Sequence, residues 1–296
     1  MSALDWQRDG AIWPHREAST FVRTGAARWH VQRMGAGPPL LLLHGTGASV
    51  HSWRGLMPLL AKTHEVIAID LPRHAFTTGH DAYAMSLPAM AREVARLLEA
   101  LAVTPAAIIG HSAGAAIALQ LALDHAFRGP IIGLSAALRP FPGAMAQIFP
   151  AIAKTLFVNP LVPRIFTGSI DLVGGAERFL WRSTHSRIDA QGLACYARLL
   201  KHPGHAGGAL AMMANWDLPA LRERMGEVAN PVLLLHGAND PAIPLQWARD
   251  AAGWLPKARL DVLPSLGHLA HEEAPDKAAA RIAAFLAEAR QESAHP

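Results

Sequence analysis

One segment dictates the architecture of this chain: Ala106-Ala107-Ile108-Ile109-Gly110-His111-Ser112-Ala113-Gly114-Ala115-Ala116-Ile117-Ala118-Leu119. A short apolar run of β type enters Gly-x-Ser-x-Gly, and an alanine-rich run of helical type leaves it. This order predicts a nucleophile elbow, in which the serine occupies a strained turn between a strand and a helix. Gly110 and Gly114 lack the Cβ atoms that would clash in such a turn. The helix that follows directs its N-terminal N–H groups to the place where an oxyanion would form.

The composition describes a globular protein without the signature of a nucleic-acid partner. The 296 residues are 51% hydrophobic and 17% charged, which suits one large folded chain. The formal net charge of +4 comes from scattered Lys and Arg, so we expect no nucleic-acid binding. Cys195 is the single cysteine, and we expect it to be a buried thiol in a reducing compartment. The first 20 residues lack an apolar signal segment, which predicts a cytoplasmic location.

Strand-like and helical runs alternate along most of the chain. The pattern predicts helices over 52–61, 87–101 and 276–289, in addition to the helix of the elbow. It predicts strands over 19–23, 27–32, 40–43, 65–69, 129–134, 231–235 and 259–263, in addition to the strand of the elbow. The first two strands form a hairpin. We therefore expect an α/β fold with a mostly parallel central sheet of about eight strands, flanked by helices and joined by right-handed crossovers.

The alternation breaks between 138 and 216, which predicts a helical lid. The core would then comprise 1–137 and 217–296, with the lid at 138–216 inserted between them. Within the lid, the apolar segment 140–163 is interrupted by polar residues and five prolines, so it does not predict a transmembrane span. It predicts two lid helices packed on the core, or an apolar lid that guards a hydrophobic pocket or touches a membrane surface peripherally.

Three distant side chains are expected to converge as a catalytic triad. Ser112 needs a histidine to accept its proton and a carboxylate to orient that histidine. Asp240 and His268 follow the last two predicted strands, in the chain order Ser, acid, His. All three lie at the strand ends where open α/β sheets build their sites. His271 and Asp217 are the alternative base and acid, and we interpret both as solvated surface groups.

Small residues after the strand 40–43 complete the predicted site. The oxyanion hole needs two backbone donors, which we assign to the N–H groups of Thr46 and Ala113. Gly45 and His111 are expected beside the substrate, with His111 mainly structural. The lid residues Phe149, Phe157, Met212 and Trp216 are candidates for an apolar substrate pocket, although they suit a lid core equally. The histidine spacing matches no metal motif, and no nucleotide-binding glycine motif is present, so we expect neither a metal nor a cofactor.

Over nearly its whole length the chain resembles the α/β-hydrolases. More narrowly, it resembles the accessory proteins of magnesium chelatase in bacteriochlorophyll biosynthesis, a photosynthetic pathway, in the stretches Trp13-Pro14-His15-Arg16-Glu17-Ala18-Ser19, Trp29-His30-Val31-Gln32, Leu42-Leu43-His44-Gly45-Thr46-Gly47-Ala48-Ser49 and Gly110-His111-Ser112-Ala113-Gly114-Ala115-Ala116. The resemblance implies a role near magnesium insertion into protoporphyrin, with a porphyrin intermediate and chelatase subunits as partners. One departure is clear. Relatives commonly carry Asp-Leu-Pro-Gly-His-Gly where this chain has Asp70-Leu71-Pro72-Arg73-His74-Ala75.

Three classes of function follow from these residues. The first is a serine hydrolase that acts on an apolar ester through an acyl-enzyme on Ser112. The second is a non-catalytic protein that binds or delivers a tetrapyrrole on the same scaffold, since a fold does not decide a function. The third is a related serine-triad enzyme, such as a C–C bond hydrolase or a cofactor-free haloperoxidase.

Overall fold

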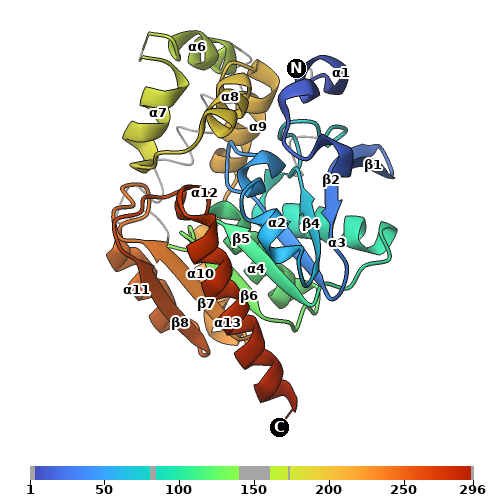
Figure 1. The fold of residues 1–296 in the computed structure, drawn as a ribbon, viewed down its shortest axis with the longest axis vertical. Coiled ribbons are helices and arrows are strands. Elements are labelled where there is room, and N and C mark those ends of the chain that lie inside the picture. The colour runs from blue at the N-terminus through green and yellow to red at the C-terminus, as the bar shows by residue number, and fades with distance from the viewer. Residues whose placement is uncertain (1–3, 81–84, 140–160, 173, 295–296) are drawn as a thin grey trace.

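A single eight-stranded sheet organises the molecule (Figure 1). The computed structural model describes residues 4–80, 85–139, 161–172 and 174–294. The strands follow the order β1-β2-β4-β3-β5-β6-β7-β8. They span Ser19–Thr24, Ala27–Met34, Pro39–Leu43, Glu65–Ile69, Ala107–His111, Ile131–Leu134, Val232–Gly237 and Ala258–Leu263 for β1 to β8. β2 runs antiparallel to β1 and β4. The six strands β4, β3, β5, β6, β7 and β8, in this order across the sheet, are parallel to one another. The predicted architecture is confirmed.

The inner strands β3 to β7 are mainly apolar on both faces because helices cover both sides of the sheet. In β3, Leu41 and Leu43 face one core cluster, and Leu40 and Leu42 face the other. The first cluster packs against α3 (Leu87–Ala100), α4 (Ala113–Asp124), α10 (Leu218–Arg224) and α11 (Leu245–Trp254). The second packs against α2 (Met57–Leu60) and α13 (Pro275–Ala294), and the short α12 (Ala270–Glu273) precedes α13. A strand buried on both faces reads as a continuous apolar run, as 40–43 does.

Among the described residues, four helices between β6 and α10 form the part of the molecule that we call the cap. They are α6 (Val162–Ser169), α7 (Gly175–Thr184), α8 (Ala190–Leu200) and α9 (Pro203–Ala214), seen at the top of Figure 1. All lie inside the segment predicted as a lid, while the division at 138 and 216 stays a prediction. Most of the apolar segment 140–163, including Phe149 and Phe157, lies outside the described residues. Among the described helices, none is long and apolar enough to cross a membrane.

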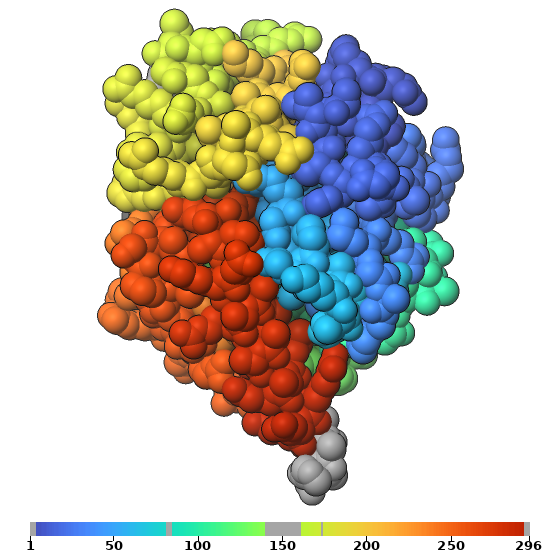
Figure 2. Space-filling model, viewed as in Figure 1, coloured from blue at the N-terminus to red at the C-terminus, as the bar shows by residue number. Residues whose placement is uncertain are grey.

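The N-terminal arm joins the core to the cap, and Figure 2 shows it beside the cap helices. It comprises α1 (Trp6–Asp9) and two short 3-10 turns, Gly10–Ile12 and Arg16–Ala18. Trp13 is buried and meets Phe76 edge to face, at 4.8 Å between ring centroids. Cys195 of α8 is fully buried, 3.8 Å from the Ile12 carbonyl oxygen, and burial raises the pKa of its thiol to about 12. The prediction of a buried cysteine is confirmed.

Candidate active site

The elbow places Ser112 on a strained turn between β5 and α4. Its backbone adopts φ 49° and ψ −111°, a conformation that surrounding contacts must hold. The Ser112 N–H donates to the Leu134 carbonyl at 2.8 Å, and the Ser112 carbonyl accepts from Ala137 N–H at 3.1 Å. A Cβ atom at Gly110 would collide with the backbone of Gly114, and one at Gly114 would collide with β3. Both glycines are therefore required by close backbone approach.

Asp240 and His268 form a hydrogen-bonded pair at the same end of the sheet. The Nδ1–H of His268 donates to Oδ2 of Asp240 at 2.7 Å. Oδ1 of Asp240 accepts from the N–H groups of Ala242 and Ile243 at 2.8 and 2.9 Å. Burial tends to raise the pKa of Asp240, but the hydrogen bond and charge of His268 outweigh it and lower the pKa overall. The carboxylate stays ionised at neutral pH and holds His268 with Nε2 as the free acceptor.

Ser112 and His268 line the same cavity without a hydrogen bond between them. The Ser112 hydroxyl makes no hydrogen bond to any described residue, although both side chains face one space. In unliganded hydrolytic sites the bond between nucleophile and base is often long and tightens with substrate. The arrangement therefore has the Asp240–His268 hydrogen bond already formed, with the Ser112 hydroxyl on the wall of the same cavity.

The turn after β3 lies against the nucleophile. Residues 45–48 are closed by a hydrogen bond from Ala48 N–H to the Gly45 carbonyl at 3.1 Å. A Cβ atom at Gly45 would lie 2.7 Å from Nδ1 of His111 and 3.1 Å from Cβ of Ser112, so a larger residue there would displace the His111 ring or Ser112. The N–H groups of Thr46 and Ala113 have no acceptor among the described residues. Two free donors beside Ser112 are what an oxyanion hole requires.

The cavity around Ser112 has a volume of about 220 Å³ and a mainly apolar wall. Gly45, Thr46 and His111 line it on the core side, as predicted. The cap contributes the other wall through α7, α8 and α9, with Phe179, Leu180, Tyr196, Leu200, Ala209 and Met213. The cap thus forms the wall of the cavity opposite the core, and Ser112 stays partly exposed.

The family follows from comparison with known proteins. Residues 40–281 match the sequence model of the alpha/beta hydrolase family. The chain belongs to this family.

Similarity to individual proteins refines this result. The chain is 42% identical over 282 residues to the magnesium-chelatase 30 kDa subunit of Rhodobacter capsulatus, covering 93% of this chain and 97% of that one. It is 28% identical over 248 residues to the pimeloyl-[acyl-carrier protein] methyl ester esterase of Vibrio atlanticus, covering 81% and 90%. An alpha/beta hydrolase fold protein from Burkholderia ambifaria superposes with a TM-score of 0.74 at 21% identity, covering 90% and 97%. The resemblance to magnesium-chelatase accessory proteins is confirmed.

Two predicted pocket residues of this alpha/beta hydrolase lie elsewhere. Met212 is fully buried in the core, where its Sδ accepts the Thr46 hydroxyl at 3.4 Å. Trp216 packs against the core cluster on the α4 side of the sheet. Met213, one position along α9, is the methionine that lines the cavity. Composition alone could not distinguish these neighbours because the cap's orientation on the core decides which side of α9 faces Ser112.

The two alternative triad members have different environments. Asp217 is exposed and caps α10 by accepting from Ala220 N–H at 3.1 Å, as expected for a surface group. His271 was also expected at the surface, and that interpretation is wrong. Its ring is buried between His111 and Trp53, at 4.6 and 4.9 Å between centroids, and burial lowers its pKa well below the usual value. The turn that follows His268 folds inward as α12, which the sequence did not predict.

His111 supports the loop that carries His268 as well as lining the cavity. Its Nε2–H donates to the His268 carbonyl oxygen at 3.1 Å. Burial lowers the pKa of His111 to about 3, so the ring is neutral at working pH. The expectation of a mainly structural side chain beside the substrate agrees with these contacts.

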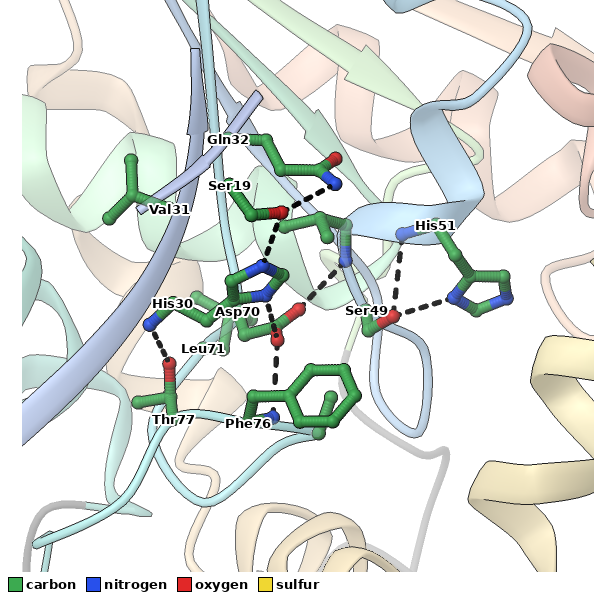
Figure 3. Close-up of polar contacts among 12 residues, drawn as sticks. Ser19, His30, Val31, Gln32, Ser49, His51, Asp70, Leu71, Phe76 and Thr77 are labelled. Carbon is green, nitrogen blue, oxygen red and sulfur yellow. Dashed lines mark hydrogen bonds and ion pairs between the residues drawn. The ribbon is translucent and has the colours of Figure 1, made fainter. Parts of the chain in front are cut away.

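Sequence reasoning missed a second Ser–His–Asp set, shown in Figure 3. Nδ1 of His30 lies 2.7 Å from Oδ2 of Asp70, and Nε2 lies 3.0 Å from Oγ of Ser19. His30 and Asp70 are fully buried. Asp70 also accepts from the N–H groups of Val50 and Phe76 at 2.8 and 3.2 Å. Because this set binds together the hairpin and the loops after β3 and β4, we interpret it as structural.

The loop that carries His268 is bonded to the connection between α7 and α8. His268 N–H donates to the Thr184 carbonyl at 2.8 Å, and Leu269 N–H donates to the Ser186 hydroxyl oxygen at 2.9 Å. Glu273 accepts from the Ser186 hydroxyl at 2.7 Å. The cap therefore helps to hold the loop that carries His268.

A buried ionic network lies behind the cavity wall. The Tyr196 hydroxyl donates to Glu272 at 2.7 Å, and Arg54 pairs with Glu272 and, at 3.0 Å, with Asp189 of the cap. Burial raises the pKa of Glu272 to about 6 against the opposing effect of Arg54. In the described part of the chain, no three His, Cys, Asp or Glu side chains converge as metal ligands would.

Proposed function

We propose that this alpha/beta hydrolase cleaves esters of a short, uncharged acyl group through an acyl-enzyme on Ser112. One observation carries the proposal: the elbow serine, the Asp240–His268 pair and two unpartnered backbone N–H groups border one small apolar cavity. These are the nucleophile, base and electrostatic stabiliser that acyl transfer requires.

The mechanism follows from the hydrogen bonds. Asp240 fixes the Nδ1–H tautomer of His268, so Nε2 accepts the Ser112 proton as Oγ attacks the ester carbonyl carbon. The N–H groups of Thr46 and Ala113 stabilise the oxyanion. When the C–O bond breaks, His268 returns the proton to the leaving alcohol. Water then attacks the acyl-enzyme with His268 as base, which releases the carboxylic acid and restores Ser112.

The size and polarity of the cavity set the acyl group. At about 220 Å³, it is smaller than the roughly 300–1,000 Å³ of typical ligand pockets. The hydroxyls of Ser183 and Thr184 donate to carbonyls of their own helix, Phe179 and Leu180. The Tyr196 hydroxyl is engaged by Glu272. With its hydroxyls engaged within the protein, the cap wall favours an uncharged acyl chain.

A chain-length series tests this proposal. With p-nitrophenyl esters, we expect kcat/KM to be highest for acetate to butyrate and to fall about 10-fold or more for octanoate, since groups that do not fit a pocket cost roughly that factor. A fluorophosphonate probe should label Ser112 at neutral pH, as mapped by peptide mass spectrometry. An enzyme that neither turns over these esters nor takes up the probe would contradict the proposal.

A second candidate function rests on the relative from Rhodobacter capsulatus. We propose that the chain also acts beside magnesium chelatase, because the similarity to its 30 kDa subunit extends over nearly all of both chains. The Ser112 cavity is too small to enclose a porphyrin macrocycle, since it lies below the roughly 300 Å³ lower limit for drug-sized ligands. This favours contact with chelatase subunits over carriage of a tetrapyrrole within that cavity.

Binding to immobilised chelatase subunits measures this role. We expect saturable binding of the wild-type chain that Ser112→Ala leaves unchanged, because that residue faces the interior cavity. Titration with protoporphyrin IX should produce no saturable Soret shift. Absence of saturable subunit binding would refute the association, and a saturable Soret shift would favour tetrapyrrole delivery instead.

A further inference from the structure

Helix α9 holds the turn of the proposed oxyanion hole from the outside. His205 places Nε2 3.0 Å from the Gly47 carbonyl oxygen, and the Thr46 hydroxyl donates to Sδ of Met212 at 3.4 Å. His205 and Met212 both belong to α9. Gly47 has φ 75°, a left-handed conformation that glycine adopts freely and also leaves freely. Because Gly47 is flexible and adjoins Thr46, the contacts from α9 matter for the position of the Thr46 N–H group.

The other ring nitrogen of His205 defines its tautomer. Nδ1 lies 3.0 Å from the backbone nitrogen of Ala75. A backbone N–H only donates, so Nδ1 is the acceptor and Nε2 carries the hydrogen that is donated to Gly47. The ring is 3% exposed, and burial lowers its pKa to about 3. The neutral ring therefore bridges the oxyanion turn and the loop after β4 at all working pH values.

The bridged loop holds two non-glycine residues in an unusual backbone conformation. Arg73 and Ala75 both have a left-handed backbone, at φ 61° and 41°. Such angles cost a non-glycine residue roughly 1–2 kcal/mol, so contacts must hold them. Gly208 of α9 packs so closely on Arg73 that a Cβ atom would collide with the Arg73 carbonyl. The helix that carries His205 is thus fitted to this loop.

A second histidine bridges the same two segments from inside the core. Nδ1–H of His44 donates to the Gly45 carbonyl at 2.8 Å, and its Nε2 accepts from Leu71 N–H at 2.9 Å. The tautomer is the reverse of that of His205. His74 packs between the two rings, at 5.2 Å from each between centroids. The oxyanion turn is therefore fixed at both of its ends, once by the core and once by the cap.

We propose that His205 is a positioning residue for the oxyanion hole: its Nε2–H bond to the Gly47 carbonyl holds the turn so that Thr46 N–H faces the developing oxyanion. The inference rests on the proposed function. Loss of one oxyanion donor costs about 100- to 1000-fold in kcat, and a misplacement of about 1 Å elsewhere costs about 100-fold. If the Thr46 N–H is still present but less firmly held, we expect the loss of kcat to lie near the lower end of these values.

Two substitutions separate the two bonds of His205. In His205→Gln, the amide nitrogen lies near the position of Nε2 and keeps the bond to Gly47. In His205→Asn, the amide oxygen lies near the position of Nδ1 and keeps the bond to Ala75. With p-nitrophenyl butyrate we expect His205→Asn to lower kcat about 10- to 100-fold with KM within about twofold. His205→Gln should keep kcat within about threefold.

Controls separate positioning from stability and from the proposed function. Denaturation midpoints should fall similarly for both variants. Asn215→Ala, a control at the C-cap of the same helix where the side-chain amide donates to the Ala211 carbonyl, should leave kcat within about twofold. With an active wild type, equal kcat losses in His205→Asn and His205→Gln would overturn the role of His205 alone. A wild type without turnover or labelling would overturn the proposed function as well. Nitrogen-15 NMR of the wild-type ring gives a check independent of the variants, because a hydrogen on Nδ1 would refute the proposal.

Discussion

Replacing Ser112 with alanine is expected to abolish ester hydrolysis, lowering kcat by about 10⁴- to 10⁶-fold, as removal of a triad serine does in other hydrolases. The variant keeps the unpartnered N–H groups of Thr46 and Ala113 but has no oxygen to form the acyl-enzyme. The Ser112 side chain makes no hydrogen bond to the described residues. Folding should therefore be unaffected, and the loss should lie in kcat. Steady-state kinetics and loss of fluorophosphonate labelling measure it.

Ser19 offers a matched control within the same chain. It also stands beside a histidine that is bonded to an aspartate, but His30 is packed among the rings of Trp6, Phe21 and Phe76. Ser19→Ala should keep kcat within about twofold and lower the unfolding free energy by about 1 kcal/mol, the net contribution of a hydrogen bond. Turnover that survives in Ser112→Ala but disappears in Ser19→Ala would reverse the assignment of the nucleophile.

Acidification is expected to unfold the protein between about pH 5 and 4, because the fold buries neutral histidines. Burial lowers the pKa of His74 to about 4 and those of His111 and His205 to about 3. In the unfolded chain these rings titrate near 6.5. Below that value the unfolded state binds more protons, so the unfolding free energy falls as the pH falls and is fully retained above about pH 7.

The expected change of the unfolding free energy with pH is large relative to the stability of a typical protein. Each of the three histidines contributes a slope of up to about 1.4 kcal/mol per pH unit. Glu272 acts in the opposite direction, since its raised pKa of about 6 lets the folded state take up a proton first. Between pH 6 and 4.5, protonation of Glu272 offsets the slope contributed by about one histidine. The remaining slope of about 3 kcal/mol per pH unit would consume a typical stability of about 5–15 kcal/mol within a few pH units.

Urea titrations followed by circular dichroism from pH 8 to 4.5 measure this slope. His205→Gln removes one buried ring and should flatten the slope by about 1.4 kcal/mol per pH unit below pH 6. His185, an exposed histidine of the cap, is the matched control, and His185→Gln should leave the slope unchanged. An unfolding free energy that stays constant between pH 7 and 5 would contradict the burial of neutral rings.

Local patterns predicted the strands and the elbow well. The apolar run 65–69 matches β4 in full, and 40–43 differs from β3 by one residue. These segments are buried on both faces, so hydrophobicity alone marks them. The helix expected over 52–61 is divided into a 3-10 turn, Val50–Trp53, and the short α2. Gly55 and Pro58 lie in this segment, and both disfavour a continuous helix.

Contacts between distant segments could not be predicted in this way. The sequence carries no local sign that His205 reaches Gly47 and Ala75, more than a hundred residues earlier. The same holds for the burial of His271 and for the pairing of His30 with Asp70. In each case the packing of a loop or of the cap decides the environment of a polar side chain. Spacing and chain order predicted only one such contact, the pairing of Asp240 with His268, because both residues follow strands of the same sheet.

The bonds from the loop of His268 to Thr184 and Ser186 bear on how substrate enters. If the cap moved away from the core as one rigid body, it would displace the backbone of His268 and change the orientation of its imidazole ring. Admission should instead rely on rotation of wall side chains such as Phe179 and Met213, with the connection between α7 and α8 staying fixed. For the same reason, a shortened chain without the cap helices would lose both one wall of the cavity and a support of the loop that carries His268.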